Sequence, residues 1–445
     1  MSNRETIFAL SSAPGRAGVA VVRVSGPGTV GAITKMAGPL PPPRSMSYRA
    51  IRDVGMNAVI DRGLVVWFSG PASFTGEDSA EFHIHGGRAV IARLLSALGR
   101  LQGFRMAEAG EFATRAFHSG KIDLAEAEGL ADLIDAETEA QRLQALRQAD
   151  GVLSKIYEGW RTELITAGAL IEAAIDFSDE ADVSEKSVVE AVEIVKRLSE
   201  EIANHLDDGR RGEILREGFR VVLAGPVNSG KSSFLNWLSK RDAAIVSEEP
   251  GTTRDVVEIK LDLEGLPIIV SDTAGFRETK GVVEREGIRR SRLQMNKADL
   301  VIWMMPANRE MALPKDRSSN DRQLLVASKA DLVDGSSGFY LSDKKAKLIS
   351  LKNGLGLEEL RQEIIEIASK RIGTTESPAL TQAHHRNKLE ICLERLTGFL
   401  SADQSDTELR AEDLRLAANA LGRITGRVDA EDLLDQIFGR FCIGK

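Results

Sequence analysis

Cysteine is scarce in this chain of 445 residues, which contains only Cys392 and Cys442. The two residues lie far apart, and neither belongs to a Cys-x-x-Cys pair. Structural zinc sites use closely spaced Cys and His ligands, and disulfides belong to oxidising compartments. The sequence therefore offers no zinc site and is typical of a protein of the reducing cytoplasm.

Long hydrophobic runs are also missing. The longest strongly apolar run, residues 300–307, is far shorter than the roughly 18 residues that cross a bilayer. Residues 1–6 lack the apolar core of a secretory signal. We expect a soluble, cytoplasmic protein that does not associate with membranes.

Positive charge is not in excess, because 58 Lys and Arg residues are outnumbered by 66 Asp and Glu residues, for a formal net charge of −8. A net negative field disfavours binding of a polyanion. Contact with a nucleic acid therefore requires a local basic patch or the surface of a partner.

The length predicts about three domains. The residue pattern also changes along the chain, from one typical of strands and turns to one typical of helices. Short β-like runs with Gly-Pro turns and a helix-like stretch at 89–101 are followed by helical spacing after Asp123, a predicted N-cap. The helical pattern returns near the end of the chain, so two helical segments flank an α/β block. We predict a multidomain α/β and α+β protein: an α+β domain at 1–119, a discontinuous helical domain at 120–215 and 375–445, and an inserted α/β domain at 216–374.

A glycine-rich loop marks the inserted domain. An apolar run at 220–224 precedes residues 225–232, which match GxxxxGKS, and a helical pattern follows over 233–238. Strand, loop and helix in this order are the context of a phosphate-binding P-loop. Main-chain amides at the helix N-terminus attract phosphate. Lys231 is expected to reach the β- and γ-phosphates, and Ser232 to bind Mg²⁺.

Three further elements follow in the order that GTPases use: residues 251–255 with a threonine for Mg²⁺, residues 272–275 near the γ-phosphate, and residues 328–331. The carboxylate of Asp331 can accept from guanine N1–H and N2–H, which adenine lacks, so it selects GTP over ATP. The predicted nucleotide-binding residues are Asn228, Ser229, Gly230, Lys231, Ser232, Ser233, Ser247, Glu248, Glu249, Pro250, Gly251, Thr252, Thr253, Asp272, Thr273, Ala274, Gly275, Ser328, Lys329, Ala330, Asp331, Ser350, Leu351 and Lys352.

Two positions depart from the usual GTPase motifs. Ser328 replaces the Asn of Asn-Lys-x-Asp, and its shorter side chain is predicted to lose reach to the phosphate loop and the base. Leu351 stands where the base-contacting loop usually has Ala, and the backbone contact there is expected to survive. We therefore predict weaker nucleotide affinity, with the choice of guanine kept by Asp331.

The glutamine that positions water in Ras-type GTPases is replaced here by Phe276. Another group must therefore position the water and neutralise charge. The side-chain oxygen of Asn228, inside the phosphate loop, is a candidate ligand for a monovalent cation against the phosphates. Glu284 is a candidate for orienting the water, although its spacing alone favours a solvated charge on a helix. Glu284, Asn228 and Lys231 are the predicted catalytic residues.

Motifs outside the nucleotide site, together with the GTPase elements, resemble one family along essentially the whole chain. The chain is similar to the tRNA modification GTPases called MnmE or TrmE, within the TrmE-Era-EngA-like P-loop GTPases. The resemblance implies a Ras-like GTPase domain and an N-terminal folate-binding-like domain that forms a homodimer. The matching segments are residues 13–18, 22–26, 74–78, 85–87, 110–117, 120–128 and the terminal 441–445.

The family is activated by potassium, and its GTPase domains pair across the cation site. The resemblance assigns the family's catalytic glutamate to Glu284. It implies Ser232 and Thr253 as Mg²⁺ ligands, and it implies Asn228, Ser247, Glu249 and Thr252 around K⁺.

The resemblance further implies a site for a tetrahydrofolate derivative, 5-formyl- or 5,10-methylene-tetrahydrofolate. The family's folate contacts fall on Arg23, Glu81, Lys121 and Lys445. Arg and Lys can pair with the glutamate-tail carboxylates, and Glu81 can accept from pterin N–H groups. Taken alone, each of the four is an ordinary surface charge.

Two further features, a histidine pair and a cysteine, are candidate chemical sites. His83 and His85 alternate on one predicted strand, but no third ligand is near in the sequence, which favours a packed or dimer-facing pair over a metal site. Cys442 is a candidate reactive thiol, although no base adjoins it in the sequence.

The resemblance implies a potassium-activated GTPase that works with the flavoprotein MnmG (GidA) in a heterotetramer or larger complex. The pair adds an aminomethyl or carboxymethylaminomethyl group to C5 of the wobble uridine of certain tRNAs, with a carbon from folate. The alternative is a ribosome-assembly or regulatory GTPase that binds RNA without modification chemistry. Such proteins often carry a KH module with a GXXG loop, and the sequence contains no convincing KH arrangement.

Overall fold

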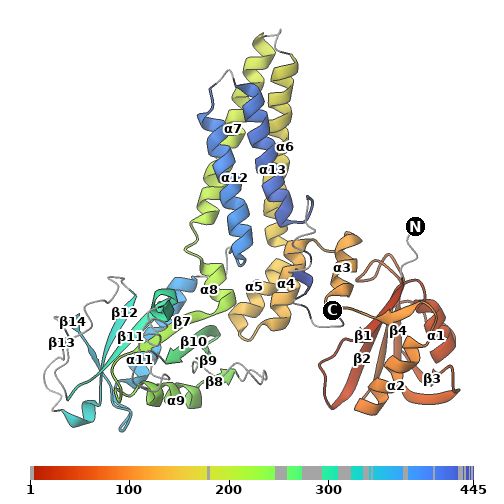
Figure 1. The fold of residues 1–445 in the computed structure, drawn as a ribbon, viewed down its shortest axis with the longest axis horizontal. Helices are drawn as coiled ribbons and strands as arrows, with labels where there is room; N and C mark the ends of the chain where they lie inside the picture. The colour runs from red at the N-terminus through yellow and green to blue at the C-terminus, as the bar shows by residue number, and fades with distance from the viewer. Residues whose placement is uncertain are drawn as a thin grey trace, which may run out of the picture. The chain divides into compact units, whose positions relative to one another are not determined.

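The computed structural model describes residues 5–177, 181–245, 258–272, 293–308, 322–333, 340–341, 344–373, 379–403 and 406–428, together with 434, 437–439, 441 and 444. The chain forms two units, which Figure 1 shows with their elements labelled. The first contains Met1–Ala131, Gln148–Ala191 and Asp403–Lys445, and the second contains Asp132–Arg147 and Val192–Ala402. Helical segments belong to both units, and the boundaries of the four predicted segments stay a prediction.

The first unit begins with a six-stranded sheet in the order β3-β4-β5-β2-β1-β6. Neighbouring strands are antiparallel except β1 and β6, which are parallel. Alternate residues such as Val22, Val24, Phe82 and Ile84 form the core on one face with residues of α1 and α2, so the predicted α+β class is confirmed. The elements are β1 (Thr6–Leu10), β2 (Ala17–Ser25), α1 (Thr29–Ala37), β3 (Ser47–Asp53), β4 (Ala58–Phe68), β5 (Ser79–Gly86), α2 (Arg88–Gly99) and β6 (Phe104–Met106).

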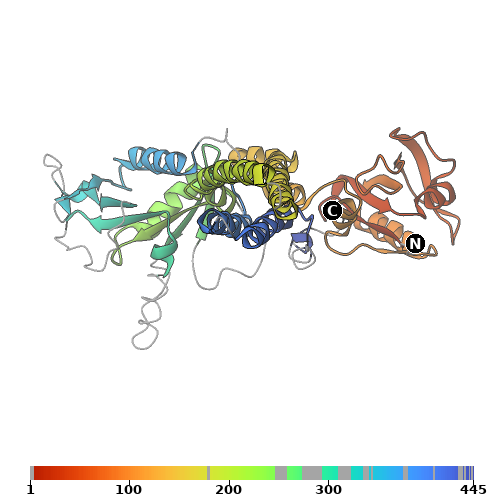
Figure 2. The same cartoon turned by 90° about the horizontal axis from the view of Figure 1, so that it is seen from above.

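Helices follow the sheet, as predicted from the spacing of apolar residues. The helix α4 (Leu124–Asp135) begins with a reciprocal cap: Glu126 N donates to Asp123 Oδ1 and Asp123 N donates to Glu126 Oε2, both at 2.8 Å. The prediction of Asp123 as an N-cap is therefore confirmed. The other helices of this unit are α3 (Glu111–His118), α6 (Val152–Asp176) and α13 (Thr407–Ile424), and α6 and α13 run side by side in Figures 1 and 2.

The last residues of the chain return to this unit. Phe438 and Phe441 pack with Leu124 and Ala127 of α4 in one apolar cluster. Ser11, after strand β1, donates a hydrogen bond from Oγ to the carbonyl of Gly444 at 2.9 Å. The end of the chain and the end of β1 are therefore neighbours although they are at opposite ends of the sequence.

The second unit contains a seven-stranded sheet in the order β15-β12-β11-β7-β10-β9-β8. Strands β15, β12, β11, β7 and β10 are parallel, and β9 and β8 continue the sheet antiparallel. The core on one face joins alternate strand residues, such as Val221 and Leu223, to the helices α9 and α11. The bounds are β7 (Phe219–Ala224), α9 (Lys231–Arg241), β8 (Ala243–Ile245), β9 (Glu258–Leu263), β10 (Leu266–Asp272), β11 (Leu300–Pro306), β12 (Gln323–Ser328), η2 (Ala330–Leu332), β15 (Lys347–Leu348) and α11 (Leu357–Ile372).

A half-buried arginine anchors the helical segments of the second unit. Arg386 donates to Asp208 Oδ1 at 2.6 Å, to Glu213 Oε1 at 2.7 Å and to the carbonyl of Leu206 at 2.8 Å. These contacts tie α12 (Ala383–Ser401) to α8 (Arg211–Glu217) and to the end of α7 (Ala181–Leu206). The remaining elements are α5 (Glu139–Ala149), β13 (Tyr340–Leu341) and β14 (Lys344–Lys345). Of the helices that the structure describes, none has the length and hydropathy of a membrane span.

Candidate functional site

The loop between β7 and α9 has a backbone that requires glycine. Gly225 has φ +142°, and a Cβ there would lie 2.1 Å from the carbonyl oxygen of Met304. Gly230 has φ +96° and is the residue before α9. Because any larger residue at Gly225 would collide with β11, the loop can turn back over the sheet only with glycine at this position.

Lys231 is the first residue of α9 and its side chain folds back over the loop. Its Nζ donates to the carbonyls of Gly225 and Pro226, both at 2.9 Å, and the residue is 3% exposed. Burial lowers the pKa of Lys231, and the negative charge of Asp272 opposes this shift. The ammonium is thus held at the loop, where it can exchange these carbonyl contacts for phosphate oxygens.

Oxygen ligands suited to Mg²⁺ meet beside this lysine. Strands β7 and β10 pair in parallel with Asp272 opposite Leu223, so Asp272 ends at the same edge of the sheet as the loop. Ser232 Oγ donates to Asp272 Oδ2 at 2.6 Å. A hydroxyl and a carboxylate are the hard ligands that Mg²⁺ uses beside phosphate, and the pair fits the predicted metal position.

The loop also contains a buried hydroxyl that lacks a partner. Ser229 is fully buried, and its Oγ has no hydrogen-bond partner among the described residues. Unsatisfied buried polar groups are uncommon and destabilising. A hydroxyl left open inside the loop agrees with a site built around a polar ligand.

The expectation that Ser328 loses reach to the phosphate loop is wrong. Ser328 ends β12, is 1% exposed, and donates from Oγ to the carbonyl of Ser229 at 2.6 Å. Parallel pairing of β11 and β12 places Ser328 opposite Pro306, which brings its backbone close to the loop. The short hydroxyl of Ser328 therefore reaches the phosphate loop, although the longer side chain of Asn was expected to be necessary for this contact.

The base-recognition residues form a connected group. Ser350 Oγ donates to Asp331 Oδ1 at 2.7 Å and accepts from the backbone N–H of Lys352 at 3.3 Å. The hydrogen bond from Ser350 and the nearby charges of Lys352 and Lys329 hold the pKa of Asp331 below its usual value. Asp331 is therefore an ionised acceptor at neutral pH, as recognition of guanine N–H groups requires.

For the other predicted site residues that the structure describes, backbone conformation and burial are the main observations. Lys329 adopts a left-handed conformation with φ +60°, and Asn228 does so with φ +63°. Ser233 is exposed, Ala330 is buried, and Leu351 is half-buried against the loop, 3.4 Å from where a Cβ of Gly230 would be.

Many predicted site residues lie outside the described residues, so their roles stay predictions. They are Ser247, Glu248, Glu249, Pro250, Gly251, Thr252, Thr253, Thr273, Ala274, Gly275, Glu284, Cys442 and Lys445.

The candidate folate residues of the first unit include a cross-strand ion pair. Arg23 of β2 lies opposite Glu81 of β5, and its Nη2 is 3.0 Å from Glu81 Oε1. The guanidinium carbon lies 5.7 Å from the ring centre of Phe74 and 5.9 Å from that of Phe112. The expectation that Arg23 pairs with a tail carboxylate did not foresee this partner, which depends on the pairing of two distant strands.

The histidines and Lys121 lie near the same sheet. His83 Nε2 lies 3.3 Å from Glu81 Oε2, and His85 Nδ1 lies 2.9 Å from Asp61 Oδ1. Lys121 is exposed, with its Cε 3.5 Å from where a Cβ of Gly76 would be. Sequence reasoning missed the contact between His83 and Glu81, although their two-residue spacing on a strand was a usable signal.

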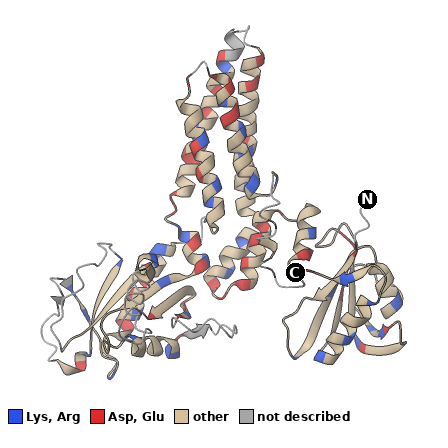
Figure 3. Cartoon of the chain, in the orientation of Figure 1, with Lys and Arg blue, Asp and Glu red and all other residues tan. Residues whose placement is uncertain are grey.

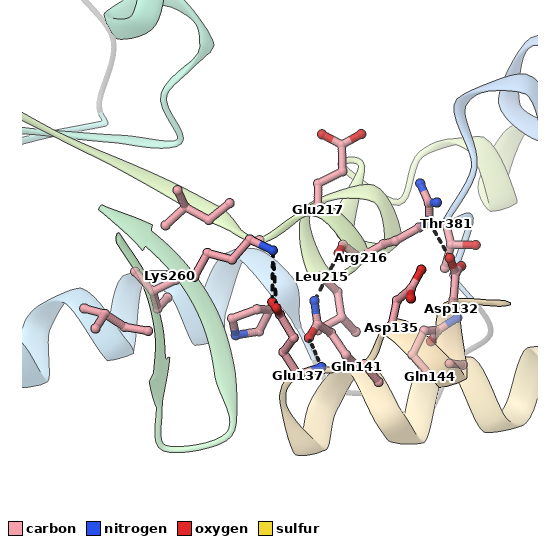
Figure 4. A pocket seen from close by; sticks show the side chains of 17 residues that line it. Asp132, Asp135, Glu137, Gln141, Gln144, Leu215, Arg216, Glu217, Lys260 and Thr381 are labelled. Carbon is pink, nitrogen blue, oxygen red and sulfur yellow. Dashed lines mark hydrogen bonds and ion pairs between the residues drawn. The ribbon is translucent and has the colours of Figure 1, made fainter. Parts of the chain in front are cut away.

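A cavity of the second unit is lined by residues of α5, α8, β9 and β10, among others, and has a volume of ≈ 270 Å³ (Figure 4). At its wall Lys260 Nζ lies 3.1 Å from Glu137 Oε2, and Gln141 Nε2 donates to the carbonyl of Arg216 at 3.0 Å. The predicted site residues that the structure describes do not line it. Its polar contacts hold α5 against the strand pair and serve the packing of this unit.

The Ser328 contact gives a testable prediction. Ser328→Ala removes the hydrogen bond to Ser229, and a hydrogen bond of this kind contributes about 0.5–1.5 kcal/mol. We expect the Kd for GDP to rise by about 2- to 12-fold in fluorescence titration. Ser239→Ala removes a similar bond, to the carbonyl of Leu235 in α9 at 2.8 Å, and should leave the Kd unchanged. Equal Kd values for all three proteins would contradict the role of Ser328.

Residues 6–121 match the family model for the GTP-binding protein TrmE N-terminus, and residues 124–442 match that for the MnmE helical domain. Among solved structures, the G domain of the T. maritima FeoB iron transporter is 24% identical to this chain, and the match covers 34% of this chain and 98% of that domain with a TM-score of 0.24.

Curated relatives cover the full length of the chain. The tRNA modification GTPase MnmE of Maricaulis maris is 51% identical over 99% of both chains. The protein of the same name from Methylobacterium radiotolerans is 48% identical over 100% of both chains. That from Parvibaculum lavamentivorans is 50% identical over 99% of this chain and 100% of the relative. Identity at this level along the whole length shows that the chain belongs to the family of tRNA modification GTPases MnmE.

Proposed function

We propose that the chain hydrolyses GTP to GDP and phosphate and that this hydrolysis serves the modification of tRNA. The single observation that supports it most is that Lys231, Ser232 and Asp272 meet at the phosphate loop, while Ser328, three residues before Asp331, is hydrogen-bonded to Ser229 of the same loop. This arrangement suits a guanine nucleotide with its metal ion. Membership of a family named for tRNA modification supports the second half of the proposal.

In the proposed site the chain's own residues bind and orient the nucleotide. Main-chain amides of the loop and the start of α9 hold phosphate oxygens, and Lys231 turns from the carbonyls of Gly225 and Pro226 toward them. Ser232 and Thr253 hold Mg²⁺, with Asp272 behind Ser232. The ion, when bound, neutralises charge on the phosphates. Asp331 accepts from the base and excludes adenine.

Hydrolysis then requires a positioned water and additional positive charge. Glu284 orients the water, and Asn228 supplies an oxygen for K⁺ together with Ser247, Glu249 and Thr252. Asn228 is exposed in the loop and its left-handed backbone is one that Asn tolerates. Its side chain is therefore free to turn toward a cation beside the phosphates.

The N-terminal part of the first unit is the proposed binding site for a tetrahydrofolate derivative, 5-formyl- or 5,10-methylene-tetrahydrofolate. Its charged groups Arg23, Glu81 and His83 gather on one face of the sheet, and Lys121 lies beside the loop at Gly76. Gly444, the neighbour of Lys445, contacts Ser11 at the end of β1. These contacts suit a ligand with both carboxylates and N–H donors.

The proposed reaction adds an aminomethyl or carboxymethylaminomethyl group to C5 of the wobble uridine of tRNA in the cytoplasm. The chain acts as a homodimer with the flavoprotein MnmG, and GTP hydrolysis opens and closes the paired GTPase domains. Mass spectrometry of tRNA nucleosides from a deletion strain tests this proposal. An unchanged set of nucleosides would favour a ribosome-assembly GTPase instead.

Glu284→Ala tests the link between hydrolysis and modification. General acid–base groups contribute about 10²–10⁴ in rate, so we expect a loss of hydrolysis of this size with unchanged GTP affinity. Cells that carry the variant should lose the modified wobble nucleoside. Glu286→Ala, two residues further on, is the control and should retain both activities. Wild-type modification in Glu284→Ala cells would sink the proposed coupling.

The cation role of Asn228 is tested by the choice of salt. Positive charge supplied by an arginine finger is worth about 10³–10⁵ in other GTPases. We therefore expect hydrolysis in KCl to exceed that in NaCl by at least about tenfold for the wild-type chain. Asn228→Gly keeps the left-handed backbone and should remove most of the difference. Equal rates of wild type in both salts would refute the assignment.

A further inference from the structure

Arginines gather at the edge of the seven-stranded sheet that lies opposite the phosphate loop. Arg220 is the second residue of β7, Asp299 precedes β11, and Arg322 precedes β12. The amide of Arg220 donates to Asp299 Oδ2 at 2.9 Å, and that of Val301 donates to the carbonyl of Arg322 at 2.9 Å. Because β7, β11 and β12 are parallel, their amino ends share this edge and their carboxyl ends share the nucleotide site.

Two helices bring further arginines to the same place. Arg371 is in the last turn of α11, and its charge acts on Asp299 together with those of Arg322 and Arg220. Arg211 begins α8, and its Nη1 is 3.0 Å from where a Cβ of Gly373 would be, just beyond the end of α11. Arg211, Arg220, Arg322 and Arg371 are called the basic edge below. Figure 3 shows Lys and Arg segments beside α8 and at the end of α11.

Three of the four arginines of the basic edge differ from other arginines of the same unit because they have no carboxylate partner among the described residues. Arg361 contacts Asp242 at 2.7 Å, and Arg386 contacts Asp208 at 2.6 Å. Arg220 lies 3.4 Å from the exposed Glu217. Within the part of the chain that the structure describes, no carboxylate lies within ion-pair distance of the three remaining members, Arg211, Arg322 and Arg371.

Asp299 does not neutralise the group. Its carboxylate accepts from the backbone of Arg220, and burial raises its pKa against the opposing effect of the three arginine charges. One partly buried carboxylate thus faces several guanidinium groups, of which Arg322 is exposed. Two more cations, the exposed Arg210 and Lys370, flank the basic edge, although Arg210 is paired with Glu213 at 2.8 Å.

We propose that the basic edge binds the phosphate backbone of tRNA. The inference rests on the proposed function, which makes tRNA a partner of the chain. A planar guanidinium group can donate two parallel hydrogen bonds to phosphate oxygens. Arg211 uses its Nε for the carbonyl of Asp208 at 2.9 Å, and an arginine without a carboxylate partner keeps its other N–H groups available. The chain as a whole has a net charge of −8, so a polyanion needs a local surface of this kind. An acidic protein surface is the competing partner.

The test removes two unpaired charges from the intact protein. Arg322→Gln/Arg371→Gln and the wild-type homodimer are titrated with unmodified tRNA, purified from a deletion strain, over a range of salt concentrations. Each phosphate contact contributes about 0.7–0.9 to the slope of log K against log salt. We expect the slope to decrease by about 1.4–1.8 and GTP hydrolysis to stay at the wild-type rate. Arg322→Lys/Arg371→Lys should keep most of the slope.

A matched control separates local contacts from overall charge. Arg142→Gln/Arg415→Gln removes the same charge from two exposed residues that are already paired with Glu139 and Glu412, and its slope should equal that of the wild type. An equal decrease in this control would overturn the proposal. So would a double variant that keeps the tRNA slope but no longer binds MnmG, because the surface would then belong to a protein partner.

The inference can fail while the proposed function stands. Wild-type protein that does not bind tRNA, in a strain whose wobble uridine is fully modified, would overturn the basic edge alone. A deletion strain with unchanged tRNA nucleosides would overturn the proposed function as well.

Discussion

The close approach of the phosphate loop to the carboxyl ends of β11 and β12 is the constraint on which the nucleotide site depends. Gly225 leaves no room for a side chain against the carbonyl of Met304. On the other side, Ser328 donates a buried hydrogen bond to Ser229. These contacts hold the loop, together with Lys231 and Ser232 that follow it, beside the carboxyl ends of β11 and β12. A shift of either strand would separate phosphate binding from base selection.

Features that depend on neighbouring residues could be predicted from the sequence. The strand, loop and helix of the phosphate site follow from the glycines around Lys231, and the reciprocal cap at Asp123 follows from the residue three positions later. Features that depend on strand pairing could not. The reach of Ser328 is set by the register of β11 and β12, and the partner of Arg23 by the register of β2 and β5. No local pattern contains this information.

The arginines of the second unit fall into two groups, one paired with carboxylates and one largely without carboxylate partners. Paired and mostly buried residues such as Arg361 and Arg386 hold helices together, and breaking buried pairs of this kind is costly. At the basic edge, Arg211, Arg322 and Arg371 have no carboxylate partner among the described residues. Nucleotide and nucleic acid would therefore meet opposite edges of one sheet, and the same strands would connect the two sites. This arrangement links the proposed hydrolysis to the proposed substrate through the core of a single unit.

The central claim is that a guanine nucleotide is gripped by the loop around Lys231 and selected by the ionised carboxylate of Asp331. Calorimetric titration of the purified chain with GDP and with ADP tests it most directly. Two hydrogen bonds to a charged acceptor contribute about 1.5–3 kcal/mol each, so GDP should bind at least about a hundredfold more tightly than ADP. Comparable affinities for the two nucleotides, or binding of neither, would contradict the account.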